Sequence, residues 1–283
     1  MSRIKASIII PTFNKLLRLK IVLKSLESQI NDEIEVIVVF DGCKSEVVEE
    51  FQKLQFAFTP VQVVCPENVG RARARNKGIE KAKGEVVIFL DDDRIVSPNY
   101  IATHLKQHEA GYPVVLGERK EFYLSDEDIE KYYKEHTRLS AYCEEKGQIA
   151  RYVFSKRAKS PLRWLNFYTG NVSVDRQLLV KVKGFDEAFT GWGHEDIDLG
   201  IRLYFEGAAF SYTQEAINYH MMHESNFSNK KQQSIRNLKY MRQKYRKHLR
   251  VKLFLLLLII KQHIFGLRIS KEQQKKYELL SRA

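Results

Sequence analysis

Three adjacent aspartates, Asp91, Asp92 and Asp93, directly follow the apolar run Val86–Leu90. Adjacent carboxylates repel one another, and holding them at the end of a buried strand is costly unless a cation compensates their charge. Mg²⁺ and Mn²⁺ prefer oxygen ligands and often complete their coordination with substrate phosphates. The triplet therefore predicts a metal site that stabilises a departing diphosphate. The alternative is a solvated acidic turn before a helix capped by Ser97.

A second set of acids lies in the segment 191–198, GWGHEDID. Glycines on both sides of Trp192 indicate a closely approached loop whose aromatic face is free to stack on a sugar. Glu195 and Asp196 supply carboxylates that can act as a base toward an acceptor hydroxyl. A plain helix start with acids in its first turn is the alternative. It explains Asp196 and Asp198 but not the glycine–tryptophan run.

His220, with His223 three residues later, is a third candidate for chemistry. A neutral imidazole can complete the metal shell to which the aspartate triplet contributes. Taken alone, a histidine is more often an ordinary surface or core residue. His220 therefore becomes a metal-ligand candidate only in combination with the triplet.

The elements that must position these residues follow from the apolar pattern of the first half. Short β-branched runs predict strands, and apolar spacings of three and four residues predict helices. The strands are expected at 7–10, 35–40, 61–64 and 86–90, and the helices at 15–29, 45–54 and 71–82. This alternation predicts an α/β fold with a Rossmann-like, mostly parallel sheet flanked by helices.

Polar residues follow all four predicted strands, at the edge where ligands of open parallel sheets bind. They are Pro11-Thr12-Phe13-Asn14, Asp41-Gly42, Pro66-Glu67-Asn68 and the aspartate triplet. Each group alone is typical of a turn. Four such groups on one edge of the sheet predict a common binding site.

The net charge of +12 is carried by the C-terminal segment. From Lys230 to the end the chain holds 16 Lys/Arg and 2 Glu, whereas residues 1–229 hold 31 Lys/Arg and 33 Asp/Glu. The apolar run Leu253–Ile260 is shorter than the about 20 residues that a spanning helix needs. An apolar stripe of helical period precedes it, formed by Ile235, Leu238, Met241, Tyr245 and Leu249.

Two interpretations of this basic helical segment stay open. In one, it lies peripherally on an anionic membrane surface. In the other, its apolar face packs on the rest of the chain or on another copy in a homo-oligomer. Nucleic acid is not an expected partner, because no RNA-binding aromatic signature is present and the basic residues lie outside the motifs.

The three cysteines, Cys43, Cys65 and Cys143, fit neither a disulfide framework nor zinc spacing. They predict a reducing compartment, and hence a cytoplasmic location, on the inner face of the membrane if the basic segment binds it. The first apolar run, Ile8–Ile10, is too short for a signal peptide. Dehydrogenases and P-loop enzymes are disfavoured because neither glycine motif is present.

The motifs, taken in order, resemble a known family. The N-terminal half resembles glycosyltransferase family 2 of the GT-A fold. The later half resembles the galactosyltransferase-type C-terminal region of β-1,4-galactosyltransferases, polypeptide N-acetylgalactosaminyltransferases and bacterial chondroitin polymerases. The resemblance covers about residues 5–225. Beyond the polar strand ends and the segment 191–198, it is carried by Asn68-Val69-Gly70, Ala74-Arg75-Asn76-Lys77-Gly78, Thr169-Gly170-Asn171, Gly184-Phe185-Asp186-Glu187 and Tyr219-His220.

This resemblance implies a role for each matched residue. The triplet matches a DxD motif, in which Asp93 binds Mn²⁺ or Mg²⁺ and Asp91 approaches the ribose or phosphate, with His220 as the later metal ligand. Asp196 matches the usual base, Glu195 orients the acceptor, and Trp192 touches both donor sugar and acceptor. The other donor-binding residues that it implies are Pro11, Thr12, Asn14, Asp41, Asn68, Arg71 and Asp92.

The implied reaction is inverting transfer of a sugar from a UDP-sugar to the hydroxyl of a glycan, lipid-linked or protein-linked acceptor. The implied organisation is a GT-A catalytic domain at 1–229 followed by a basic helical extension at 230–283. Within the domain, 1–118 is the nucleotide-binding half and 119–229 the acceptor half.

The sequence departs from the family pattern at two places. His194 stands where the family often has glycine, and Met221-Met222-His223 follows His220, which leaves open whether His220 or His223 binds the metal. A non-catalytic nucleotide- or carbohydrate-binding protein on the same fold is the competing hypothesis. Such a protein needs no base, so the joint presence of the triplet, Asp196 and His220 favours the enzyme.

Overall fold

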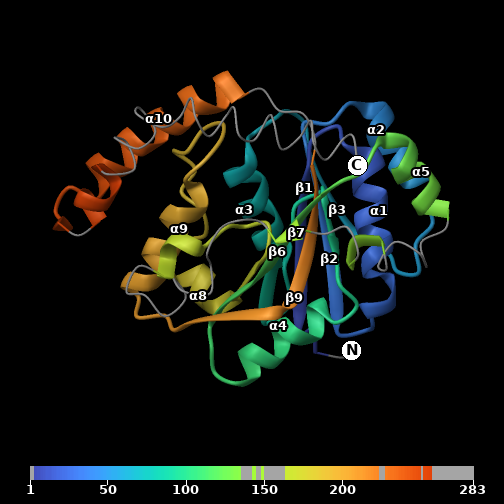
Figure 1. Cartoon of the computed structure of the whole chain (residues 1–283), viewed down its shortest axis with the longest axis horizontal. Coiled ribbons are helices and arrows are strands. Elements are labelled where there is room, and N and C mark those ends of the chain that lie inside the picture. The colour runs from blue at the N-terminus through green and yellow to red at the C-terminus, as the bar shows by residue number, and fades with distance from the viewer. Residues whose placement is uncertain are drawn as a thin grey trace.

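The computed structural model describes residues 3–134, 142–144, 148–149, 163–222, 227–249 and 251–256. One central sheet carries helices on both faces (Figure 1). The elements of the first half are β1 (Ala6–Thr12), α1 (Leu16–Leu26), η1 (Glu27–Gln29), β2 (Ile34–Asp41), α2 (Ser45–Gln52), β3 (Val61–Cys65), α3 (Arg71–Lys81), β4 (Val86–Phe89), β5 (Arg94–Val96) and α4 (Tyr100–Glu109). Those of the second half are β6 (Val114–Tyr123), α5 (Asp126–Lys134), β7 (Gln148–Ile149), η3 (Arg163–Asn166), β8 (Val172–Asp175), α8 (Arg176–Lys181), α9 (Glu195–Phe205), β9 (Phe210–Met222) and α10 (Phe227–Lys244).

The four N-terminal strands of the sheet form its parallel part, in the order β3-β2-β1-β4. Ile8 and Ile10 of β1 join one apolar layer and Ile9 joins the other, because successive side chains of a strand point to opposite faces. A strand that is apolar on both sides needs helices on both faces of its sheet. Helices α1 and α3 provide this cover on opposite faces.

Beyond β4 the sheet is mixed, in the order β8-β6-β9-β5. Strand β8 is antiparallel to β4 and β6, β5 is antiparallel to β9, and β6 and β9 are parallel. The predicted α/β fold class is confirmed. The prediction of a mostly parallel sheet holds for the strands β3, β2, β1 and β4, but beyond β4 the sheet is mixed. The aspartate triplet joins β4 to β5 too tightly for the helical crossover that parallel neighbours require, so β5 pairs elsewhere, with β9.

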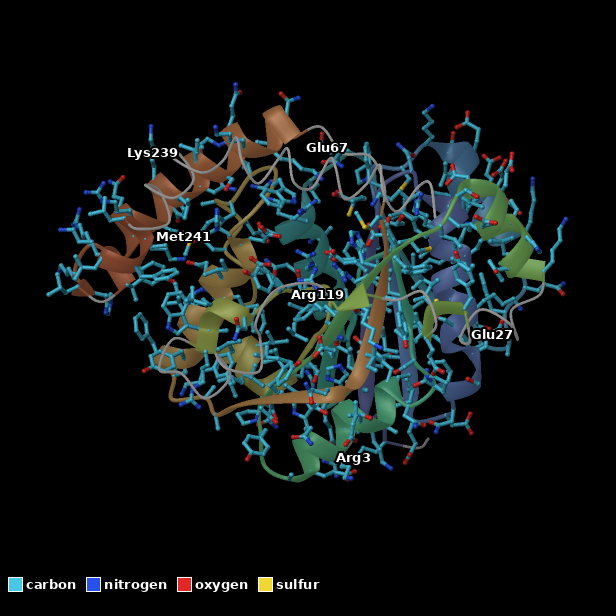
Figure 2. The ribbon with its side chains drawn as sticks, viewed as in Figure 1. Arg3, Glu27, Glu67, Arg119, Lys239 and Met241 are labelled. Atoms are coloured by element: carbon cyan, nitrogen blue, oxygen red, sulfur yellow. The ribbon has the colours of Figure 1, made fainter. Side chains whose placement is uncertain are left out.

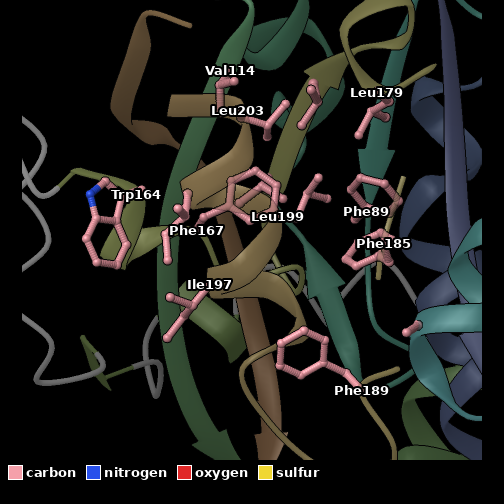
Figure 3. Packing of buried hydrophobic residues seen from close by; sticks show 14 of the residues in the cluster. Phe89, Val114, Trp164, Phe167, Leu179, Phe185, Phe189, Ile197, Leu199 and Leu203 are labelled. Carbon is pink, nitrogen blue, oxygen red and sulfur yellow. The ribbon is translucent and has the colours of Figure 1, made fainter. Parts of the chain in front are cut away.

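Two apolar layers sandwich the sheet, one with α1, α2, α4 and α5 and the other with α3, α8, α9 and α10. Figure 3 shows the second layer. There Phe89 of β4 meets Phe185 edge to face, with ring centroids 5.2 Å apart, and α9 contributes Ile197, Leu199 and Leu203. This layer packs the end of β4, which carries the triplet, against the helix that carries the second set of acids.

Helix α10 packs on the same layer through its apolar stripe. Leu238, Met241 and Tyr245 are buried, whereas Leu249, five residues beyond the end of α10, is 67% exposed. Figure 2 shows Met241 on the side of α10 that faces the protein body and Lys239 on the opposite side. The structure therefore supports the packing interpretation for α10. Residues 257–283 of the expected extension lie outside the described residues.

Among the residues that the structure describes, no helix combines the length and the apolar character needed to cross a membrane.

Candidate active site

The aspartate triplet lies at the carboxyl end of β4, where a lysine neutralises two of its carboxylates. Thr12 Oγ1 donates a 2.8 Å hydrogen bond to Asp92 Oδ2. Lys15 Nζ lies 3.3 Å from Asp92 Oδ1 and 3.0 Å from Asp93 Oδ2. Burial raises the pKa of Asp92 to about 6, while Lys15 opposes this rise and Asp93 adds to it. Lys15, just beyond the end of β1, therefore partly compensates the negative charge of the aspartates beyond the end of β4.

The solvated-turn interpretation of the triplet is wrong. Asp92 and Asp93 are each only 6% exposed. Helix α4 begins at Tyr100 with Asn99 at its N-cap position, so Ser97 does not cap it. Burying carboxylates costs free energy that ion pairs must offset, and a simple turn gives no reason for that cost.

Asp93 and His220 form a pair of side chains suited to a divalent cation. The pairing of β5 with β9 sets Arg94 opposite His220, which brings His220 Nε2 to 3.8 Å from Asp93 Oδ2. Burial lowers the pKa of His220, although Asp93 raises it, which favours the neutral imidazole that metals bind. A carboxylate and an imidazole match the ligand preferences of Mn²⁺.

Substrate oxygens must complete any metal shell here. Among the described residues, no three His, Cys, Asp or Glu side chains gather into a metal site. Hard cations commonly take a few protein ligands and several oxygens from phosphates and water. His223, the other histidine considered for this role, lies outside the described residues.

The predicted nucleotide-binding residues lie at the ends of β1, β2, β3 and β4 and at the start of α3. The Asp41 carboxylate accepts hydrogen bonds from the backbone amides of Val69 and Gly70, at 2.7 and 3.1 Å. Gly42 has a φ of +67°, and a Cβ there would lie 2.1 Å from the Asn68 nitrogen, so only glycine fits. Asp41 thus shapes the loop that precedes α3. Direct contact with a nucleotide stays a prediction for Pro11, Thr12, Asn14, Asp41, Asn68, Arg71 and Asp92.

Buried Arg75 of α3 links the two sets of acids. Its guanidinium lies 3.0 Å from Asp91 Oδ1 and 3.1 Å from Glu195 Oε1. Arg94 Nε lies 3.4 Å from the other oxygen of Asp91. Burial raises the pKa of Asp91, but Arg75 and Arg94 outweigh it and lower the pKa to about 2. The aspartate triplet and the acids of α9 therefore share one cation.

Sequence reasoning assigned no role to Arg75 or Lys15. Arg75 lies within a matched motif, on the face of α3 that also buries Ala72 and Gly78. A charged residue on an apolar helix face is the signal that could have identified it. Lys15 gave no such signal, because its partners come from a strand end about 80 residues later.

Helix α9 begins at Glu195 and carries Asp196 in its first turn. Glu195 and Asp198 are buried in ion pairs, whereas Asp196 is partly exposed and accepts a 2.8 Å hydrogen bond from Ile197 N. Burial, with the negative charge of Glu195, raises the pKa of Asp196 to about 7. The alternative interpretation of the segment 191–198, a plain helix start with acids in its first turn, is thus right about where the helix begins. Asp196 in addition has the exposure and the pKa of a general base.

The loop in front of α9 exposes Trp192 and is held from the outside by α10. Trp192 is 39% exposed. Its backbone nitrogen donates a 2.8 Å hydrogen bond to Gln233 Oε1, and Asn237 Nδ2 donates to the Gly193 carbonyl at 2.8 Å. Sequence reasoning missed these contacts because the family motifs end before α10. The exposed indole suits contact with a sugar, which stays a prediction.

Two family models match the chain. Glycosyl transferase family 2 matches residues 7–178, and the N-terminal domain of galactosyltransferase matches residues 150–225. Together they include the triplet, the Trp192 loop, Asp196 and His220. Helix α10 lies outside both matches.

Comparisons with known proteins agree with these matches. An uncharacterized glycosyltransferase, YfnE of Bacillus subtilis, is 29% identical over 85% of this chain and 70% of its own. The chondroitin synthase of Pasteurella multocida is 32% identical over 76% of this chain, which spans only 24% of that protein. The mannosyltransferase PcManGT of Pyrobaculum calidifontis, solved with GDP-Man and Mn²⁺, has a similar fold, with a TM-score of 0.61, 18% identity and coverage of 93% of this chain and 71% of its own.

Proposed function

The chain belongs to glycosyltransferase family 2, and we propose that it transfers a sugar from a UDP-sugar to an acceptor hydroxyl, with inversion and with a divalent cation. The observation that carries this proposal is the Arg75 bridge, because it holds the triplet and the α9 acids on one edge of the sheet. A diphosphate group and an acceptor hydroxyl therefore have adjacent places to bind.

The proposed reaction is a single displacement. Asp196 accepts the proton of the acceptor hydroxyl, whose oxygen attacks the anomeric carbon as the bond to the nucleoside diphosphate breaks. Glu195, fixed by Arg75, orients the acceptor, and Trp192 packs against the sugar. Asp93 and His220 would hold a divalent cation, which would supply Lewis-acid stabilisation of the diphosphate.

The acceptor is proposed to be a saccharide hydroxyl, on a glycan or on a lipid- or protein-linked carrier. The similarity to a chondroitin synthase supports a polysaccharide acceptor. The fold neighbour that binds GDP-Man gives reason to test guanine nucleotides beside uridine nucleotides.

The proposal predicts that Asp93→Ala loses metal-dependent donor binding. Asp93 is the carboxylate shared by Lys15 and His220, and removing it leaves the imidazole as the main protein ligand. We expect the affinity for UDP in the presence of Mn²⁺ to fall by more than about 10-fold, since even indirect changes to metal ligands act on that scale. Calorimetric titration of UDP with Mn²⁺ and with a chelator measures the effect.

A control on the same edge of the sheet makes that result specific. Glu46 is exposed in the first turn of α2, just beyond the end of β2, and Glu46→Gln should bind UDP and Mn²⁺ as the wild type does. The same titrations with GDP show whether the site prefers a guanine or a uracil nucleotide. Equal Mn²⁺-dependent binding by wild type and Asp93→Ala would remove Asp93 from the metal site.

The proposal also predicts an acid limb in the pH profile of transfer. Asp196 acts as a base only when deprotonated, and its pKa is raised to about 7 by burial and by Glu195. The value of kcat/KM should therefore be constant above this pKa and fall roughly tenfold per pH unit below it. A profile measured with wild-type enzyme at low substrate concentration tests this. A limb centred near an unshifted carboxyl pKa of about 4 would contradict it.

A further inference from the structure

Helix α10 contributes a lysine that none of the family motifs contains. Lys230 lies in the first turns of α10, and its Nζ is 5.8 Å from the centroid of the Trp192 ring. Trp192 is the exposed aromatic residue of the loop that precedes α9 and its acids. The ammonium group of Lys230 is thus directed over the site and not away from it.

Two further cations and Asp93 act on Lys230 in this part of the site, and one of the cations, Lys15, lies 3.0 Å from Asp93. Burial lowers the pKa of Lys230, the charges of Arg71 and Lys15 lower it further, and Asp93 raises it. These side chains therefore lie within electrostatic reach of one another, although they come from α10, the start of α3 and the end of β1. Lys15 is already paired with Asp92 and Asp93, whereas the repulsion between Lys230 and Arg71 is unfavourable unless a further anion binds beside them.

The position of Lys230 is fixed by the rest of α10. Gln233 and Asn237 bind the backbone of the Trp192 loop. One and two turns further on, Tyr240 and Lys244 bind Asp186, at 2.9 and 2.6 Å. With Leu238, Met241 and Tyr245 buried as well, α10 is attached along most of its length. Lys230 is presented on a rigid element, which lowers the entropic cost of binding a ligand.

We propose that Lys230 binds the diphosphate of the nucleotide donor, so that α10 forms one wall of the donor site. This rests on the proposed function, since it assigns a residue to the same donor. A diphosphate carries the charge that three cations can share, and the ammonium over Trp192 lies beside the place proposed for the sugar. Lys230 is thus a binding residue for the group that leaves with the nucleotide.

The test compares nucleoside diphosphate with nucleoside monophosphate. Calorimetric Kd values for UDP and UMP, each with Mn²⁺, are measured on full-length wild type, Lys230→Met, Lys230→Arg and Lys231→Met, with GDP and GMP in parallel. Hydrogen bonds to charged groups contribute about 1.5–3 kcal/mol, so Lys230→Met should bind UDP about 10- to 100-fold more weakly. UMP binding should be nearly unchanged, and Lys230→Arg should recover most of the affinity for UDP. Lys231→Met is the matched control, because Lys231 is the exposed neighbour on the same helix.

Each other outcome overturns the inference in a recognisable way. Equal UDP binding by wild type and Lys230→Met shows that Lys230 does not touch the diphosphate. Equal weakening of UDP and UMP shows a general disturbance of the site. If wild type binds neither UDP nor GDP, the proposed donor is wrong, and the role of Lys230 fails with it.

Discussion

Asp196→Asn should keep donor binding and lose transfer by a factor of about 10² to 10⁴, the range that general-base catalysis contributes. Asparagine has the shape of aspartate but cannot accept the proton of the acceptor hydroxyl. The backbone hydrogen bond from Ile197 N to the side-chain oxygen can still form, so the first turn of α9 should be preserved. Initial rates of transfer, with calorimetric donor affinity on the same preparation, measure the two parts of this expectation.

A second substitution on the same helix separates catalysis from general damage. Glu206 follows the last turn of α9 and pairs with Lys181 at the surface. Glu206→Gln should therefore leave both transfer and donor binding near wild-type values, as expected for an exposed ion pair. Transfer by Asp196→Asn at more than about a tenth of the wild-type rate would exclude Asp196 as the base, given the range above.

Arg75→Met should destabilise the protein by about 3–5 kcal/mol, the cost of removing one partner from a buried ion pair. The side chains of Arg75 and Glu195 are each only 4% exposed, so the carboxylate left behind has little access to water. Asp91 keeps Arg94 but loses its closer partner. Transfer activity should fall as well, because both sets of acids lose their common anchor. Urea denaturation monitored by circular dichroism gives the free energy of unfolding.

Two further variants test whether the loss of stability in Arg75→Met comes from the carboxylate of Glu195 left without its partner. Arg73→Met removes an exposed arginine from the same helix, where it pairs with Glu187, and should cost less than about 1 kcal/mol. The double variant Arg75→Met/Glu195→Gln removes the stranded charge and should be more stable than Arg75→Met alone. A free energy of unfolding for Arg75→Met within about 1 kcal/mol of the wild type would mean that water reaches this pair and that Arg75 is not the anchor.

Strands β1 to β4 were predictable from sequence because each contains a short apolar run followed by polar residues, whereas β5 was not predicted. The predicted strand at 86–90 is β4 at Val86–Phe89, and the predicted helix at 71–82 is α3 at Arg71–Lys81. Local pattern determines such elements. The order of the later strands was not predictable, because β5 finds its partner in β9, about 120 residues further along the chain.

Residues of the candidate site could be predicted from sequence where they follow a strand or lie in a motif with several polar residues close together. Asp93 and His220 are adjacent as expected, and Asp196 lies in the first turn of a helix. Their roles toward metal, donor and acceptor stay predictions. The cations were missed because a single Lys or Arg resembles a solvated surface residue until its partners are known. Arg75 and Lys230 become informative only when the fold brings them beside residues far away in sequence.

The arginine shared by the two halves also limits how members of this family can recombine. Arg75 is encoded with the segment proposed to bind the nucleotide, yet one of its two carboxylate partners belongs to the segment proposed to meet the acceptor. A chimera that joins the first segment of one relative to the second segment of another would keep this centre only if both relatives carry the charges of Arg75, Asp91 and Glu195.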